Sequence, residues 1–216
     1  MKRFVLKRIL QLHNLCYRLA GPLAVRVEGQ HPKHRLMRYK EWFLDHVRPD
    51  DVVLDVGSNT GNMPTLIAPN VEYVYGVEID HALVAQARAN NRYDNVEYIA
   101  SDATTLDLSL LRPISVVTMS NVLEHIDARV DLLSALARRL PWRDSGERRI
   151  LIRVPMIDRD WITLYKRELG LNWRLDPTHY TEYTLDQFHE ELAAAGIKVD
   201  SADIRFGEIY AVCHVG

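Results

Sequence analysis

Short apolar segments alternate with amphipathic segments through most of this 216-residue chain. Each apolar segment has the length of one buried strand, and the apolar positions between these segments recur at the spacing of a helix. The predicted strands cover residues 52–56, 73–77, 96–100, 115–119 and 149–154, and the predicted helices cover residues 62–68, 80–91 and 127–140. Strands that alternate with helices in this way predict a parallel sheet with helices on both faces.

The last part of the chain follows a different pattern. A further helix is predicted over residues 184–195, with Gly196 at its C-terminal end. Apolar positions then recur within 199–206 and again within 209–215. Two strands joined by so short a connection must be antiparallel. We therefore predict an α/β fold with a seven-stranded, mostly parallel sheet and an antiparallel C-terminal hairpin.

The region before the first predicted strand is basic. Residues 2–19 place apolar side chains at helical spacing, with Lys and Arg elsewhere around the helix. We expect this helix to pack on the domain as a cap, and the alternative is a helix that contacts a membrane surface or a partner. Residues 31–42 are interpreted either as a solvated helix or as a lid whose cations meet an anionic ligand. Those cations are His31, Lys33, His34, Arg35 and Arg38. Residues 1–47 are thus predicted to form an N-terminal helical cap or lid, and residues 48–216 the main domain.

One long segment, residues 156–183, lacks clear periodicity and is dense in charged and aromatic residues. A long irregular connection in a compact domain is usually functional, so we predict that it forms an acceptor-pocket insert. Cations there and at the preceding strand could neutralise a phosphate or carboxylate, namely Arg153, Arg159, Lys166 and Arg174. Its aromatic residues could stack on a sugar or ring, or simply fill space; they are Trp161, Tyr165, Trp173 and Tyr180.

Charge and cysteine content narrow the class of protein. The formal net charge of -2 provides no general basic field, so no nucleic-acid partner is expected. Cys16 and Cys213 show neither zinc-ligand nor CxxC spacing, which favours a reducing compartment. Basic and polar residues interrupt the apolar positions of the N-terminal segment, so we expect no signal peptide. The prediction is a cytoplasmic protein, with membrane association through residues 2–19 as the alternative.

The segment VVLDVGSNTG, residues 52–61, combines a buried strand with a tight turn. In open α/β sheets, ligands bind beyond the carboxyl ends of the strands, where glycines let the backbone approach them. Gly57 and Gly61 supply the positive φ angles that such a turn requires. We therefore predict a site for a nucleotide-like ligand at this turn.

Four segments resemble, in order, the motifs of class I S-adenosylmethionine-dependent methyltransferases. These are VVLDVGSNTG, VYGVEID, IASDATTL and SNVLEHI. The resemblance covers residues 50–155 motif by motif and extends more loosely to the end of the chain. It implies the Rossmann-like class I methyltransferase fold, S-adenosyl-L-methionine as cofactor and S-adenosyl-L-homocysteine as product.

The resemblance also implies which residues hold the cofactor. Glu78 would accept both ribose hydroxyls, Asp102 would face the adenine amino group, and Asp55 would compensate the methionine ammonium. The full expected set is Asp55, Gly57, Ser58, Asn59, Gly61, Glu78, Ile79, Asp102, Ala103 and Asn121. Asn59 stands where the family usually has glycine, but Asn tolerates left-handed backbone geometry. A dinucleotide is disfavoured because Asn59 and Asn62 occupy positions where its fingerprint needs glycine.

Two histidines are candidates for the base that a hydroxyl acceptor requires. His125 follows the fourth strand directly, and its alternative role is to cap or orient a helix. His179 is the second candidate. His31, His34, His125 and His179 with Glu124 and Asp158 show no ligand spacing such as HExxH, so we predict no metal.

The segments EGQHPKHRLMRY, SNVLEHI, RVPMIDRDW, YKRELG and LDPTHYTEYT together resemble a group of bacterial methyltransferases found among polysaccharide-assembly proteins. This resemblance implies a sugar or glycan hydroxyl as acceptor. The predicted function is O-methylation of a small molecule or glycan, for which the basic residues allow an anionic acceptor. The alternative is a catalytically silent protein that binds the cofactor or acts as a scaffold.

Overall fold

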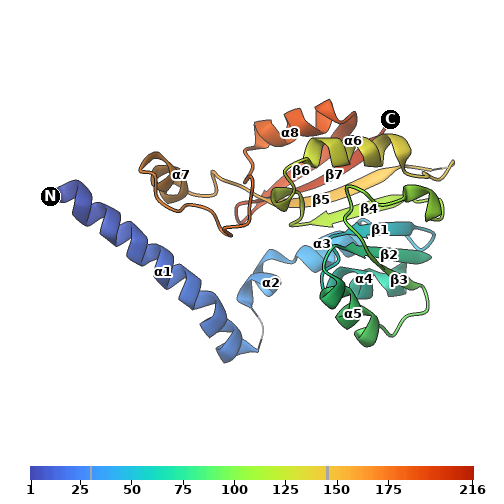
Figure 1. Ribbon diagram of the computed structural model, residues 1–216, viewed down its shortest axis with the longest axis horizontal. Helices are drawn as coiled ribbons and strands as arrows, with labels where there is room; N and C mark the ends of the chain where they lie inside the picture. The colour runs from blue at the N-terminus through green and yellow to red at the C-terminus, as the bar shows by residue number, and fades with distance from the viewer. Residues whose placement is uncertain (30, 145) are drawn as a thin grey trace.

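The structure, a computed structural model, describes residues 1–29, 31–144 and 146–216. Within them seven strands form one sheet in the order β3-β2-β1-β4-β5-β7-β6 (Figure 1). The strands are β1 (Val52–Val56), β2 (Tyr73–Glu78), β3 (Val96–Ala100), β4 (Val116–Ser120), β5 (Arg149–Pro155), β6 (Ile197–Arg205) and β7 (Glu208–Val215). Strand β7 is antiparallel to both of its neighbours, and the other strand pairs are parallel. The predicted mostly parallel sheet with its antiparallel hairpin is confirmed.

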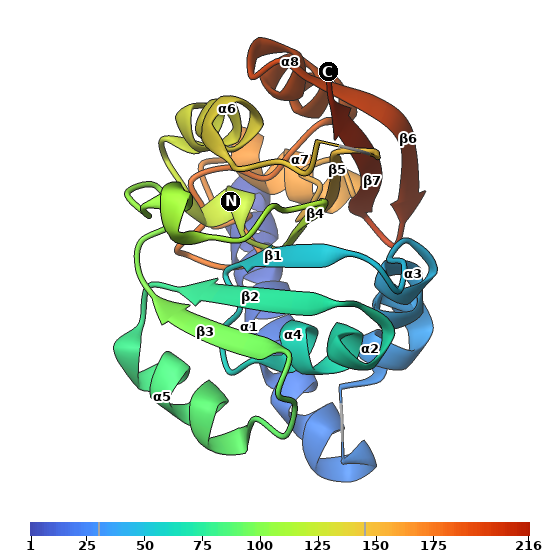
Figure 2. The ribbon, with the colours of Figure 1, turned by 90° about the vertical axis from the view of Figure 1, so that its right-hand side faces the viewer.

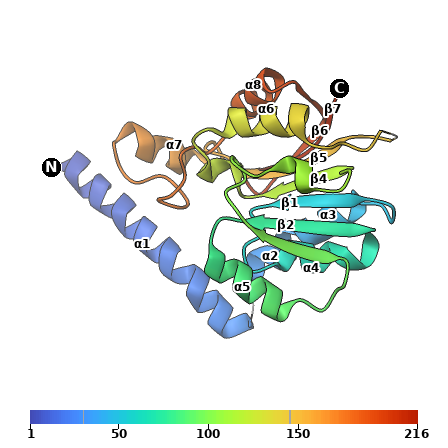
Figure 3. The same ribbon diagram turned by 45° about the vertical axis from the view of Figure 1, so that its right-hand side comes forward.

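Helices cover both faces of the sheet, as the alternating pattern predicts. On one face lie α6 (Arg129–Arg139) and α8 (Leu185–Ala194), and on the other lie α3 (Tyr39–Asp45), α4 (Asn62–Ile67) and α5 (His81–Asn90). Figures 2 and 3 show the sheet between these two layers. Successive residues of β1 point to opposite faces, so Leu54 packs in one core and Val53 in the other. Because both faces of β1 are buried, the strand has a nearly continuous apolar sequence.

Helix starts coincide with the capping residues in the sequence. Asp80 accepts hydrogen bonds from the backbone N–H groups of Ala82 and Leu83 at the start of α5. Thr184 accepts one from Gln187 at the start of α8. These caps fix the directions in which the two helices leave the sheet edge.

The N-terminal helix differs from the prediction in length and in packing. Helix α1 runs over Lys2–Glu28 and continues through Gly21 and Pro22, beyond the predicted end at residue 19. Leu10 is its one buried residue among those described, so the helix does not bury its apolar side on the domain as we expected. Its contacts with the domain are largely polar: the amine of Lys7 donates to Leu169 O at 2.9 Å, and the amide of Asn14 donates to Asn172 O at 2.7 Å. No helix in the described ranges is long and apolar enough to cross a bilayer.

Two further segments form short helices, and only the second of them is more ordered than its sequence indicates. Residues 31–45 form α2 (Pro32–Met37) and then α3, and Lys33 of α2 forms an ion pair with Glu208 of β7 at 2.6 Å. The segment 156–183 contains α7 (Trp161–Glu168), where we expected no regular element. Asp160 caps α7 by accepting from Thr163 N at 2.6 Å. A helix of two turns is too short to produce a clear periodic pattern.

Candidate active site

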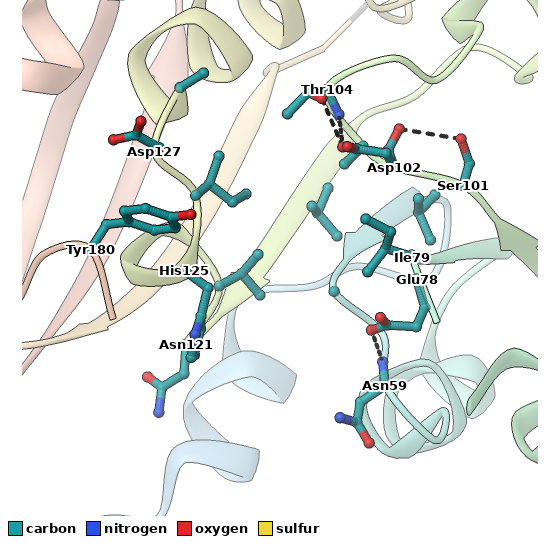
Figure 4. A pocket seen from close by; sticks show the side chains of 17 residues that line it. Asn59, Glu78, Ile79, Ser101, Asp102, Thr104, Asn121, His125, Asp127 and Tyr180 are labelled. Carbon is teal, nitrogen blue, oxygen red and sulfur yellow. Dashed lines mark hydrogen bonds between the residues drawn. The ribbon is translucent and has the colours of Figure 1, made fainter. Parts of the chain in front are cut away.

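The main cavity of the site, with a volume of about 530 Å³, lies between the carboxyl ends of β1, β2, β3 and β4 (Figure 4). Eight of the residues predicted from the sequence line it: Gly57, Asn59, Glu78, Ile79, Asp102, Ala103, Asn121 and His125. In Figure 4, His125 and Tyr180 lie on one side of the cavity, and Glu78 and Asp102 lie on the other. The sheet therefore brings together residues that are far apart in the sequence.

The turn after β1 has the left-handed geometry that the sequence predicts. Gly57, Asn59 and Gly61 have φ angles of 75°, 49° and 84°. A Cβ at Gly57 would lie 2.5 Å from a methyl group of Val122, and one at Gly61 would collide with the ring of Tyr98. Asn59 occupies its position with its side-chain oxygen accepting from Thr60 N at 2.8 Å. The turn therefore forms with Asn in place of the usual glycine. Gly61 lies outside the cavity lining and has a packing role.

Two carboxylates face the cavity in fixed orientations. Glu78 accepts hydrogen bonds from Asn59 N at 2.9 Å and Asp80 N at 3.1 Å, one on each oxygen. Each carboxylate oxygen accepts two bonds, so both oxygens can still accept from a ribose diol. Asp102 uses Oδ1 to accept from the N–H and the hydroxyl of Thr104. Its Oδ2 is then the oxygen suited to an adenine amino group.

A smaller cavity of about 290 Å³ shares Gly57, Asn59 and Asn121 with the first. Asp55 and Ser58 line this second cavity, together with Lys33, His34 and Arg153. Ser58 Oγ and Asn121 Oδ1 are buried, and neither has a hydrogen-bond partner among residues 1–29, 31–144 and 146–216. Buried polar atoms without partners indicate a place for a polar ligand. These atoms fit the amino-acid end of the predicted cofactor.

Asp55 is buried beneath this second cavity. Burial raises its pKa to about 7, and the nearby charge of Glu78 acts in the same direction. The hydroxyl of Thr118 donates to Asp55 Oδ1 at 2.6 Å and offsets only part of this shift. A cationic ligand group beside Asp55 would favour its charged form.

The two candidate bases lie together at the edge of the main cavity. The rings of His125 and His179 are 4.6 Å apart and nearly perpendicular. His125 is the last residue of the 3₁₀ helix η3 (Leu123–His125), which is separate from α6. His179 is buried and lies behind the cavity lining. Burial, followed by the charge of His179, lowers the pKa of His125, so its ring is neutral near pH 7.

Glu124 is a functional candidate to which we assigned no role from the sequence except in the rejected metal set. Its side chain is 0% exposed, and burial raises its pKa to about 7. Its position immediately before His125 was the available signal. That signal is weak because the sequence does not tell which residues of a short connection point inward.

The predicted cations of the insert and of the preceding strand β5 lie in different environments. Arg153 forms a buried ion pair with Glu208, and Arg159 is paired with Glu182. Lys166 and Arg174 line a third cavity of about 280 Å³ between α1 and the insert. Of the aromatic candidates, Tyr180 reaches the main cavity, whereas Trp161 is 70% exposed.

Solved structures share this fold. An S-adenosylmethionine-dependent methyltransferase from Aquifex aeolicus has a TM-score of 0.65 and 15% identity, over 90% of this chain and 98% of that one. Magnesium protoporphyrin IX methyltransferase from Synechocystis, solved with bound S-adenosylhomocysteine, has a TM-score of 0.62 and 17% identity, over 85% of this chain and 83% of that one.

Curated relatives match over shorter stretches. An uncharacterized protein of Methanocaldococcus jannaschii is 26% identical over 108 residues, which are 49% of this chain and 42% of that protein. The 23S rRNA uracil methyltransferase RlmD of Xanthomonas campestris is 45% identical over 60 residues, 26% of this chain and 14% of that protein. The matches thus span less than half the length of either relative.

The family assignment rests on a match to most of the chain. Residues 29–202 match a family described as a methyltransferase domain, and this range includes the turn after β1, both cavity carboxylates and both histidines. Together with the fold, this match shows that the chain belongs to the methyltransferase domain family.

Proposed function

We propose that this methyltransferase methylates a hydroxyl group of a small molecule or a sugar, such as a unit of a glycan. The observation that carries the proposal is the contact between His125 and His179 at the edge of the main cavity. Transfer to a neutral hydroxyl requires removal of its proton, and imidazole is the usual group for that task.

The cofactor would lie across the two cavities, which share Gly57, Asn59 and Asn121 in their walls. Glu78 and Asp102 are suited to hold its adenosine, and Asp55, Ser58 and Asn121 are suited to hold its amino-acid end. When bound, S-adenosylmethionine supplies a methyl group on a positively charged sulfur, so that a C–O bond to the acceptor forms as the C–S bond breaks. The protein positions the acceptor and disposes of its proton.

The hydrogen bonds of both histidines leave one ring nitrogen available. Thr178 Oγ1 lies 2.7 Å from Asp176 Oδ1 and 2.9 Å from His125 Nδ1. Since the Thr178 hydroxyl donates to Asp176, it accepts from His125 Nδ1–H, and His125 Nε2 carries a lone pair. His179 Nδ1 lies 3.0 Å from Glu182 Oε1, which assigns the same tautomer. The acceptor proton can therefore pass to an Nε2 atom.

The surroundings of the insert favour a polar, anionic acceptor. Tyr180 presents its ring to the main cavity, and the third cavity combines Arg18, Lys166 and Arg174 with Trp173. Cations beside aromatic rings suit a sugar that carries a phosphate or carboxylate. The resemblance to methyltransferases found among polysaccharide-assembly proteins supports the same acceptor class. Of the two interpretations of residues 31–42, the lid would act through Lys33 and His34, which line the second cavity.

The purified protein should convert S-adenosylmethionine to S-adenosylhomocysteine in the presence of a matching sugar, sugar phosphate or phenol. His125→Ala should reduce kcat about 10²–10⁴-fold, the usual contribution of a general base, and leave the Kd for S-adenosylhomocysteine unchanged. Product formation by mass spectrometry and binding by calorimetry test the two effects. Cofactor binding without methyl transfer to any member of the panel would instead support the silent scaffold.

Glu78→Gln should weaken S-adenosylhomocysteine binding on the order of tenfold to a hundredfold, because hydrogen bonds to a charged group contribute about 1.5–3 kcal/mol. Titration calorimetry measures this change, and the Tm of the free variant verifies that it is folded. Glu97→Gln, on the outer strand β3, provides a matched control because Glu97 is exposed. Equal binding by Glu78→Gln and the wild type would remove Glu78 from the cofactor site.

Cofactor affinity should rise between about pH 6 and about pH 8, because a bound ammonium lowers the raised pKa of Asp55 and binding then releases a proton. Titrations in buffers with different ionisation enthalpies measure the number of protons released. The Asp55→Asn variant should bind the cofactor more weakly, and its affinity should no longer rise with pH. A rise in affinity that persists in Asp55→Asn would assign the released proton to another group.

A further inference from the structure

Glu124, His125 and His179 form a compact set of potential metal ligands. One ligand atom from each residue lies within 4.8 Å of the other two. The three come from two segments: η3 carries Glu124 and His125, and the insert carries His179. A hydrogen bond from Tyr180 N to Glu124 O, at 2.8 Å, joins the two segments beside the cluster.

Within the part of the chain that the structure describes, the Glu124 carboxylate has no hydrogen-bond partner. Both of its oxygens are buried, and neither accepts a hydrogen bond from any residue that the structure describes. A buried carboxylate without a donor is costly, so such groups are normally paired or bound to a metal. The position of this carboxylate beside two imidazole rings makes a cation the natural partner.

Both imidazole rings are held in the form that binds metals. His125 uses Nδ1 for Thr178, and His179 uses Nδ1 for Glu182, which leaves Nε2 of each ring unprotonated. Metal-binding histidines almost always donate their other N–H to a carboxylate, a carbonyl or water, which fixes the ring orientation. Glu182 is itself held by Arg159 and by Leu175 N, so this supporting layer is well connected.

We propose that Glu124, His125 and His179 bind one divalent transition-metal cation, such as Zn²⁺ or Mn²⁺, at the edge of the main cavity. Two imidazole nitrogens and one carboxylate are a common ligand set for such ions and leave coordination positions open. This proposal departs from the prediction of no metal made from the sequence, because ligands that come from two segments produce no short spacing motif.

The role of this cation rests on the proposed function. An open coordination position would bind the acceptor hydroxyl and lower its pKa, and the proton would pass to solvent water. The proposed acceptor, a hydroxyl, is kept, but with the cation bound the two histidines would activate it through the cation instead of accepting the proton themselves, so the loss of kcat in His125→Ala would then reflect the loss of a metal ligand. Metal binding can be measured without any acceptor. A protein that binds no metal can therefore be distinguished from one that methylates no hydroxyl.

The full-length protein, stripped with chelator, is titrated with ZnCl₂ and with MnCl₂ by calorimetry. We expect one equivalent of at least one ion to bind, and Glu124→Gln and His179→Ala to weaken that binding at least tenfold. Thr178→Val should weaken it by about 10–100-fold, because it removes the partner of His125. His189→Ala is the matched control, since His189 is an exposed histidine on α8, and it should bind as the wild type does.

S-adenosylhomocysteine binding by the same variants shows that they are folded. Absence of binding of both ions by the wild type would overturn the proposal, as would binding that survives the loss of both Glu124 and His179. If the ion binds but its removal leaves methyl transfer unchanged, the site stands and its role in the reaction is overturned.

An independent observation concerns the outward side of α1. Several of its exposed apolar side chains recur at intervals of three, four or seven residues and so share one side. They include Val5, Ile9, Leu12, Leu19, Leu23 and Val27. Leu10, Lys7 and Asn14, which contact the domain, lie on the opposite side. Figure 1 shows the helix projecting past the sheet.

The charge of α1 indicates which binding partner suits its apolar side. Residues 1–27 contain six Lys or Arg residues and no Asp or Glu. Two copies packed through this side would bring these cations together, whereas anionic lipid headgroups would neutralise them. A helix with an apolar side flanked by cations has the properties of one that lies in a membrane interface. We infer that α1 binds the surface of an anionic bilayer.

Cosedimentation of the full-length protein with phosphatidylglycerol-containing vesicles and with neutral phosphatidylcholine vesicles tests this inference. The protein should pellet with the anionic vesicles, less so at high salt, and Leu12→Glu combined with Leu19→Glu should abolish pelleting. Leu110→Glu is the matched control because Leu110 is 79% exposed and lies outside α1. Equal pelleting by the double variant would overturn the inference. So would a stable dimer in light scattering that the double variant dissociates.

Discussion

The carbonyl oxygen of Val77 connects the first two strands at the site. It accepts hydrogen bonds from Gly57 N at 2.8 Å and Ser58 N at 2.9 Å, at the point where the chain leaves β1. One residue further along β2, the carboxylate of Glu78 accepts from Asn59 N. The left-handed turn is therefore attached to the end of β2 by three hydrogen bonds. Because the same turn lines both cavities, the shapes of the two cavities depend on this attachment.

Residues at strand ends were predictable because parallel strands place their carboxyl ends at one edge. Glu78, Asp102 and Asn121 each follow a short apolar strand, and the topology alone brings them to one cavity. The left-handed backbone at Asn59 was predictable from its side chain. Asp55 was placed correctly in the sequence motif, but its burial beneath the cavity depends on the packing of the neighbouring strands.

Features that depend on contacts between distant segments were not predictable. The approach of His179 to Glu124 requires the insert to fold back on η3, and the two residues are separated in the chain by α6, β5 and α7. The direction of the apolar side of α1 follows from polar contacts with Leu169 and Asn172, which carry no periodic signal. A helical pattern predicts the helix and its amphipathic character, but it does not predict which side faces the domain.

The backbone contact between Tyr180 and Glu124 has a consequence for how this enzyme can diversify. The insert supplies the wall that an acceptor would meet, and the same insert positions His179 and is hydrogen-bonded to η3. A substitution or insertion that reshapes this wall would also displace the imidazole beside the reacting centre. Under the proposed function, acceptor preference and catalytic chemistry would depend on the same segment, and new acceptors should arise more readily through side-chain exchanges than through changes in the length of the insert.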